Sequence, residues 1–187
     1  MKISLTLISC FLLASITLYS QVYKIDKNGL EAINVSTSIE KLMGKDVVKV
    51  IKSSEVIAVD EPTFAKIKGV ELRNGTIEIN VLSKLLPNAP ALSRGFIGLA
   101  FRINEDNSKF ECIYIRPANG RDSAQIRRNH SVQYISFPDY KFDRLRKEAP
   151  GEYESYADLG LNEWIKLKIV IKDTQAKFFI NENNSHH

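Results

Sequence analysis

The sequence predicts an all-β fold, a jelly-roll β-sandwich of two antiparallel sheets. Three observations support this prediction. Hydrophobic and polar residues alternate with a period of two in many short segments, turn-forming residues separate these segments, and no long segment shows the 3.6-residue period of a helix. Short strands that follow one another without helices between them are typical of sandwiches and jelly rolls.

The predicted strands cover residues 47–52, 76–82, 96–103, 109–117, 163–172 and 176–181. Turn-forming residues lie between them: Asn74-Gly75 comes before the second strand, and NEDNS (residues 104–108) joins the third to the fourth at hairpin distance. The segment GFIGLAF contains Gly95 and Gly98. Because glycine weakens a strand, this pair indicates a bend or a close approach of another chain.

Residues 1–20 have the pattern of a signal peptide, because Lys2 is followed by an apolar run that is too short for a membrane anchor. We expect cleavage after Ser20, which makes residues 21–187 a single secreted or periplasmic domain. An alternative interpretation is a lipoprotein with an acylated Cys10, but the apolar run continues past this residue. The mature chain keeps only Cys112, so no intramolecular disulfide is expected.

The charge is moderately basic and unevenly distributed along the chain. The full chain has 26 basic and 22 acidic residues, and removal of residues 1–20 leaves a net charge of +3. Residues 121–148 contain seven basic and four acidic residues, so this segment holds the whole excess. Export and the interspersed acids argue against nucleic acid as a partner, and no membrane association is expected after cleavage.

Residues 127–159 are rich in Arg, His, Gln, Tyr and Glu, and RRNHSVQY (residues 127–134) is interpreted as a strand. On a strand neither face of this segment would be a plain hydrophobic core. Its residue types offer the donors, acceptors and flat rings that sugars require. The alternative is a surface loop held by its own rings and ion pairs. The ligand-binding candidates are Arg116, Arg127, Arg128, Asn129, His130, Gln133, Tyr134 and Tyr140.

The sequence patterns that would indicate a catalytic site are weaker than those that indicate a binding site. A glycosidase with two carboxylates on one strand would pair Glu78 with an acid two or four residues later, but Asn80 and Leu82 stand there. His130 and Glu148 are the remaining candidates for an acid/base pair. No metal site is predicted, the terminal His186-His187 included, and no cofactor is expected. Calcium at NEDNS (residues 104–108) or near Asp122 is only weakly indicated.

The segments GTIEINV, GFIGLAFRIN, FECIYIRPANGR, QIRRNHSVQYIS and EWIKLKIVIK resemble concanavalin A-like lectin/glucanase domains. The resemblance is closest to secreted bacterial proteins of the family 16 glycoside hydrolase-like and 3-keto-disaccharide hydrolase-like groups, and it covers about residues 60 to 181. It implies a two-sheet jelly roll from an extracytoplasmic carbohydrate setting. The Glu-x-Asp-x-x-Glu signature of family 16 glucanases does not occur at Glu78. Such domains usually continue beyond the strand at 176–181, so a truncated C-terminus is expected.

We therefore expect a secreted, noncatalytic carbohydrate-binding domain whose partner is a poly- or oligosaccharide. One alternative is a glycoside hydrolase, or a keto-glycoside lyase or hydrolase, with His130 and Glu148 as acid and base. A second alternative is a structural or protein-interaction module, because the strand at 176–181 would have an unpaired edge.

Overall fold

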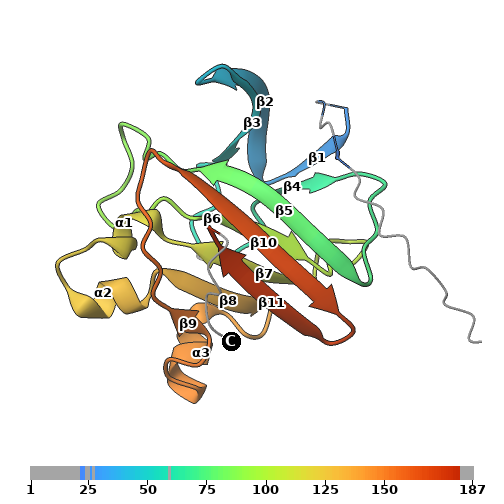
Figure 1. The fold of residues 1–187 in the computed structure, drawn as a ribbon. Coiled ribbons are helices and arrows are strands. Elements are labelled where there is room, and N and C mark those ends of the chain that lie inside the picture. The colour runs from blue at the N-terminus through green and yellow to red at the C-terminus, as the bar shows by residue number, and fades with distance from the viewer. Residues whose placement is uncertain (1–21, 24–25, 27, 59, 182–187) are drawn as a thin grey trace, which may run out of the picture.

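A computed structural model describes residues 22–23, 26, 28–58 and 60–181 of the chain. The expected signal peptide, Cys10 and the terminal histidines lie outside the described residues. Within them the chain forms eleven strands and three short helices, and none of the described helices has the length and apolar character needed to cross a membrane. Figure 1 shows the arrangement.

The first strands are β1 (Leu30–Ile33), β2 (Val35–Leu42), β3 (Lys45–Lys52), β4 (Phe64–Ile67), β5 (Gly75–Leu82), β6 (Ile97–Phe101) and β7 (Phe110–Ile115). They are followed by α1 (Pro117–Gly120), α2 (Gln125–Asn129), β8 (Val132–Phe137), α3 (Phe142–Glu148), β9 (Glu154–Ser155), β10 (Trp164–Lys172) and β11 (Gln175–Ile180). All strand pairs are antiparallel, and they form four sheets with the orders β1-β4, β2-β3, β11-β10-β5 and β6-β7-β8-β9.

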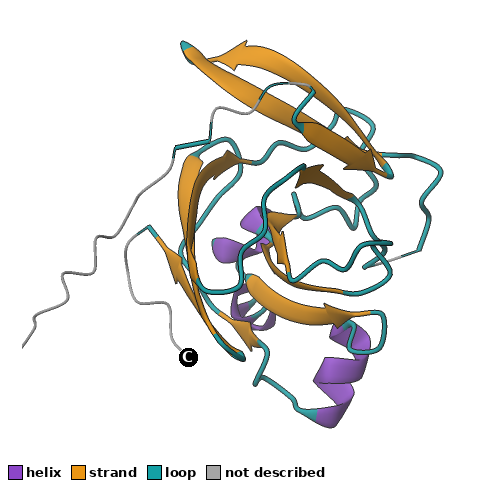
Figure 2. Cartoon of the chain, turned by 90° about the vertical axis from the view of Figure 1, so that its right-hand side faces the viewer, coloured by secondary structure: helices purple, strands orange, loops and turns teal. Residues whose placement is uncertain are grey.

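The main core lies between the sheet β11-β10-β5 and the sheet β6-β7-β8-β9, in a β-sandwich-like arrangement (Figure 2). Strand β10 shows how the sequence builds it, since every second side chain is buried and the intervening ones are partly exposed. The buried residues of β10 are Ile165, Leu167, Ile169 and Ile171. Ile113 and Ile115 of β7 belong to the same core cluster. Each fully buried aliphatic side chain contributes about 1.5–3 kcal/mol.

A second apolar cluster lies on the opposite face of β7 and β8, beneath α3. Its buried members are Phe110, Tyr114, Ile135 and Leu145. Helix α3 joins the cluster through Phe142 and Leu145, three residues apart on one helical face. Its acidic and basic residues follow the helix dipole, with Asp143 in the first turn and Arg146 and Lys147 in the last. The sheet β6-β7-β8-β9 is therefore covered on both faces.

The strands predicted at 47–52, 76–82, 96–103, 109–117, 163–172 and 176–181 are confirmed, with end shifts of one or two residues. The strands β1, β2 and β4 were not predicted. Strand β11 lies at the edge of its sheet in the described part of the chain. Gly98 also fits its prediction, because a Cβ atom there would lie 2.5 Å from Tyr114 Cα on the neighbouring strand.

The prediction of a strand at residues 127–134 is wrong for its first half. Residues 125–129 form the short helix α2, in which the amides of Arg127 and Arg128 donate to Ala124 O. The Ser131 hydroxyl then donates to Arg128 O at 2.5 Å, and β8 begins at Val132. The apolar alternation that a half-buried strand needs starts only there, so Arg127, Arg128 and Asn129 do not share a sheet face with Gln133.

The long segment after Pro138 is not an irregular loop. It contains α3 and the short strand β9, which pairs with β8 through Val132–Ser155 and Gln133–Glu154. The connection between β7 and α2 likewise begins with one helical turn, α1. These elements bring Glu154 next to the face of β7 and β8 that carries Arg116 and Gln133.

Candidate functional site

The structure distributes the predicted site residues over three places. Arg116, His130 and Gln133 lie in a buried polar cluster between β7, β8, β9 and α3. Tyr140 lines an open pocket, and the Tyr134 hydroxyl bonds to Glu111, another lining residue of that pocket. Arg127, Arg128 and Asn129 lie on α2, and Glu148 lies at the end of α3.

The buried polar group, the Arg116 cluster, is centred on the ion pair between Arg116 and Glu154. Its members are Tyr114, Arg116, His130, Gln133, Arg146 and Glu154. The Arg116 guanidinium donates to the Gln133 side chain and to the Tyr114 hydroxyl, each at 3.1 Å, and to His130 O at 2.9 Å. The Gln133 amide donates in turn to the backbone oxygens of Tyr134 and Tyr153. Arg116 and Gln133 therefore have intramolecular partners and are buried.

Glu154 is the acceptor that neutralises this cluster. Its side chain is only 4% exposed, and Arg146 binds it with two hydrogen bonds, at 2.8 Å to Oε2 and 2.5 Å to Oε1. Arg116 lies 3.4 Å from Oε1, and His130 Nε2 lies 3.4 Å from Oε2. The hydrogen bond to Glu154 raises the pKa of Arg146. One buried carboxylate thus accepts hydrogen bonds from two guanidinium groups and lies beside one imidazole.

Burial is the largest influence on His130 and lowers its pKa, while the negative charge of Glu154 acts in the opposite direction. The neighbouring cations Arg146 and Arg116 lower the pKa further. The imidazole is therefore neutral at neutral pH and has the protonation state of a general base.

Aromatic rings surround the Arg116 guanidinium. Its carbon lies 5.0 Å from the Tyr114 ring centre, 5.8 Å from that of Phe96 and 5.9 Å from that of Phe142. The Tyr114 hydroxyl donates to Asp60 at 3.1 Å, and burial raises its pKa. Phe96 is exposed, so one ring of this group lies at the surface.

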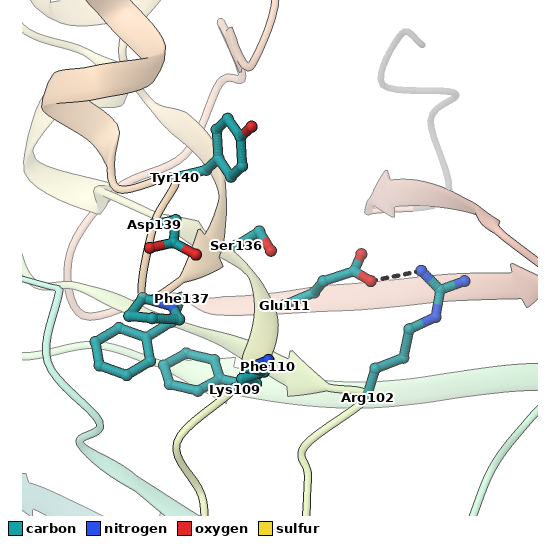
Figure 3. A pocket seen from close by; sticks show the side chains of 9 residues that line it. Arg102, Lys109, Phe110, Glu111, Ser136, Phe137, Asp139 and Tyr140 are labelled. Carbon is teal, nitrogen blue, oxygen red and sulfur yellow. Dashed lines mark hydrogen bonds and ion pairs between the residues drawn. The ribbon is translucent and has the colours of Figure 1, made fainter.

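The open pocket, the Glu111 pocket, has a volume of about 240 Å³ (Figure 3). Its lining is formed by Arg102, Lys109, Phe110, Glu111, Ser136, Phe137, Pro138, Asp139 and Tyr140. The residues come from the end of β6, the start of β7, and the end of β8 with the turn that follows it. Figure 3 shows Glu111 directed toward Arg102, with Ser136 and Tyr140 on the other side of the carboxylate.

The local fold fixes these groups. Glu111 of β7 lies opposite Ser136 of β8, and Ser136 and Tyr140 exchange two backbone hydrogen bonds, at 3.0 and 2.8 Å, that close the turn. That turn contains the cis peptide bond between Phe137 and Pro138. It places Tyr140 at the rim, where its side chain is stacked under the Arg144 guanidinium at 4.3 Å and the residue is 44% exposed.

The Glu111 carboxylate is held at both oxygens. Arg102 donates to Oε1 at 2.6 Å, and the Tyr134 hydroxyl donates to Oε2 at 3.0 Å. Arg102 is itself fixed by a second bond to Asp173 O at 2.6 Å. Burial and the negative charge of Glu111 raise the pKa of Tyr134, so this phenol remains a donor. The pocket offers a fixed cation, a fixed anion, a hydroxyl and an exposed ring.

The remaining predicted residues lie outside both groups. Arg127 pairs with Asp122 at 3.1 Å, and Arg128 donates to Asp122 O and Ser123 O. Asn129 is exposed at the end of α2. Glu148 pairs with Arg144 on the surface of α3, and no contact between Glu148 and His130 occurs among the described residues. The carboxylate beside His130 is Glu154.

Sequence reasoning proposed none of Arg102, Glu111, Arg146 and Glu154 as a site residue, although the alternative of a segment held by its own ion pairs agrees with the pairs Arg144–Glu148 and Arg146–Glu154. Glu111 carried a usable signal, since it is a charged residue on the strand face that also carries Ile113 and Ile115. Glu154 carried no comparable signal, because the strand pairing that buries it is only two residues long.

In the described part of the chain no three His, Cys, Asp or Glu side chains are grouped so as to hold a metal ion. Two of the carboxylates considered for calcium, Asp106 and Asp122, have protein partners. Asp106 accepts from the backbone and hydroxyl of Ser108, and Asp122 accepts from the Ala124 amide and Arg127.

Comparisons with known proteins give no relative: no family model matches the chain, and no curated protein or solved structure matches it significantly.

Proposed function

We propose that this chain is a carbohydrate-binding β-sandwich domain of the concanavalin A-like jelly-roll type and that the Glu111 pocket holds a sugar ring. The observation that carries the proposal is the combination of a fixed Arg102–Glu111 pair with the partly exposed ring of Tyr140 around one pocket. The signal-peptide pattern and the family resemblance of the sequence support an extracytoplasmic glycan as the ligand.

The chemistry of a sugar matches this lining. Each hydroxyl of a pyranose donates one hydrogen bond and accepts others, so it needs acceptors and donors side by side. Glu111 and Asp139 are acceptors, Arg102 and Lys109 are donors, and Ser136 is both. The apolar C–H face of the ring packs on an aromatic side chain, for which Tyr140 is placed. Arg102, Glu111 and the Tyr140 ring are held by protein contacts, so these three groups need to gain little order on binding.

Calorimetric titration of the protein with neutral oligosaccharides and soluble polysaccharides tests the proposal. We expect saturable binding, and we expect Tyr140→Ala to weaken it by about tenfold or more because the stacking surface is lost. The matched control is Tyr156→Ala, which removes a tyrosine of similar exposure (53%, against 44% for Tyr140) outside the pocket and should leave the affinity unchanged.

Two results would contradict the proposal. One is the absence of a saturable heat with every glycan of the panel. The other is an equal loss of affinity in the Tyr140→Ala and Tyr156→Ala variants.

A glycoside-processing enzyme is the second candidate, and the proximity of neutral His130 to Glu154 favours it. In that case His130 is the base, Glu154 orients it, and the exposed Phe96 beside the Arg116 cluster contacts the substrate. Continuing heat in the same titration, abolished in His130→Gln but retained in Glu148→Gln, would support this function. Continuing heat that is unchanged in His130→Gln would exclude this role for His130.

A further inference from the structure

The positive charge that the sequence concentrates in residues 121–148 is largely neutralised in three dimensions by acids from other segments. Arg121 binds Asp158 and Glu163, Lys141 binds Glu61, and Arg146 binds Glu154. Two further arginines of the segment, Arg127 and Arg144, are paired with acids inside it. The basic surface of the molecule has to be sought elsewhere.

The basic surface lies on the outer face of the sheet β11-β10-β5. The side chains of β10 that point away from the core include Lys166, Lys168 and Lys172, and Lys177 of β11 lies opposite Val170 on the same face. Among the described residues this face carries one carboxylate, Glu78 of β5, which pairs with Lys166 and Lys168 but not with Lys172 or Lys177. Figure 1 looks onto this face, and no described helix or strand lies in front of it.

Glu78 neutralises only part of this charge. Its Oε2 lies 3.3 Å from Lys166 Nζ and its Oε1 lies 3.4 Å from Lys168 Nζ, so one carboxylate is shared by two ammonium groups. The hydrogen bond from Lys166 is the main reason why the pKa of Glu78 is lowered, and the group stays ionised at neutral pH. Glu78 is 45% exposed at its side chain and thus open to a ligand as well.

The lysines form a regular array because the sheet sets their spacing. Lys166 and Lys168 are two residues apart on one strand, about 6.5–7 Å. Lys168 and Lys177 are diagonal neighbours on adjacent strands, about 7–8 Å apart. The Phe179 ring, 5.8 Å from Lys168 Nζ, provides an apolar strip beside them. On this face, positively charged groups therefore lie beside an apolar ring and beside polar groups such as Asn80 and Thr76.

We propose that this face binds an acidic polysaccharide, such as a polymer of uronic acids, independently of the Glu111 pocket. The lysines pair with carboxylates along the polymer, Glu78 and Asn80 accept its hydroxyls, and Phe179 packs on sugar C–H groups. Nucleic acid is the other polyanion to consider. Each strand of a duplex carries one phosphate about every 3.4 Å and offers few hydroxyl groups. Glu78 repels the anionic groups of both polymers, but only the polysaccharide compensates this with many hydroxyls that Glu78 and Asn80 can accept.

Binding of polygalacturonate to the protein, measured by calorimetry at low ionic strength, tests the proposal. The double variant Lys168→Gln/Lys177→Gln should weaken binding about tenfold. The control Lys68→Gln/Lys147→Gln removes the same net charge from exposed positions on other surfaces and should weaken it less than about twofold. Highly methyl-esterified polygalacturonate, which has the same backbone without most of its charge, should bind far more weakly.

Three results would overturn the proposal: no binding of polygalacturonate, an equal loss in both double variants, or equally tight binding of a single-stranded oligonucleotide. The test is separate from that of the pocket, because Tyr140→Ala leaves the basic face unchanged and should bind polygalacturonate like the unmodified chain. A variant of the pocket should thus lose only the first binding activity, and a variant of the basic face only the second.

Discussion

Glu154 is the only acidic side chain among the members of the Arg116 cluster, and it is almost fully buried. It compensates the guanidinium groups of Arg116 and Arg146, which lie on two different elements. A buried cation that loses its anion is still desolvated but no longer compensated. Removing one partner therefore lowers the free energy of unfolding by far more than the intact ion pair contributes to it.

We therefore expect Glu154→Gln, which keeps the shape but not the charge, to lower the free energy of unfolding by about 3–5 kcal/mol. Urea denaturation measures this change. The control Glu148→Gln breaks the exposed pair with Arg144 on α3 and should leave the stability nearly unchanged. A small effect of Glu154→Gln would show that water or a rearranged arginine compensates the charge.

His130 makes the stability depend on pH. Its pKa in the folded protein is lowered by burial, and the charges of Arg146 and Arg116 act in the same direction against Glu154. In the unfolded chain the imidazole titrates near its ordinary pKa of about 6.5. When the pH falls through this value, the unfolded state binds a proton that the folded state does not, so the folded state loses stability.

We expect the free energy of unfolding to decrease from about pH 7.5 to about pH 5.5 and to decrease less in His130→Gln over the same range. Urea denaturation curves at a series of pH values provide the comparison. Other groups contribute equally to both proteins, so the difference between the two slopes isolates His130. Parallel slopes would mean that the imidazole has the same pKa in both states.

At the scale of elements, periodicity identified the strands that build the sandwich and failed where structure depends on contacts distant in sequence. Strand β10 could be predicted from the sequence because its buried residues alternate with more exposed ones over its whole length. Helix α2 has no buried residue, and its sequence QIRRN carries no period that distinguishes a turn of helix from a strand. Strand β9 exists only because β8 pairs with it.

The same contrast applies to the site residues. Arg116 and Gln133 were both among the predicted binding residues because they fall in strand patterns, and they lie directly after β7 and on β8. Their partners Glu154 and Arg146 come from elements whose positions no local pattern encodes. The charge excess of 121–148 was likewise counted from neighbours in sequence, whereas most of its ion pairs are made with acids from other segments.

Gly98 tests the register of β6 and β7. A side chain there would meet the backbone of Tyr114 on the paired strand, and backbone cannot move aside as a flexible side chain can. Gly98→Ala should therefore lower the free energy of unfolding by about 2 kcal/mol or more. Gly29→Ala, where the nearest atom to the new Cβ is 3.4 Å away, is the control and should have little effect. An equally stable Gly98→Ala variant would contradict the observed strand pairing.

At the scale of the whole molecule, stability is distributed unevenly between the sandwich and the hairpin β2-β3. None of the side chains in β2 and β3 is fully buried, and the two strands pair with each other outside the two main sheets (Figures 1 and 2). One connection to the sandwich is the contact of Lys45 Nζ, 5.3 Å from the Trp164 ring centre. Strand β10, by contrast, carries four buried aliphatic residues in the main core.

Regions with few buried apolar contacts open without unfolding the rest of a protein. We therefore expect native-state hydrogen exchange to show two levels of protection. The hydrogen-bonded amides of β2 and β3 should exchange through a local opening that costs much less than global unfolding, while those of β10 should exchange only at the free energy of global unfolding. Equal opening free energies for the hairpin and for β10 would mean that the hairpin is an integral part of the cooperative core, held by contacts stronger than the one between Lys45 and Trp164.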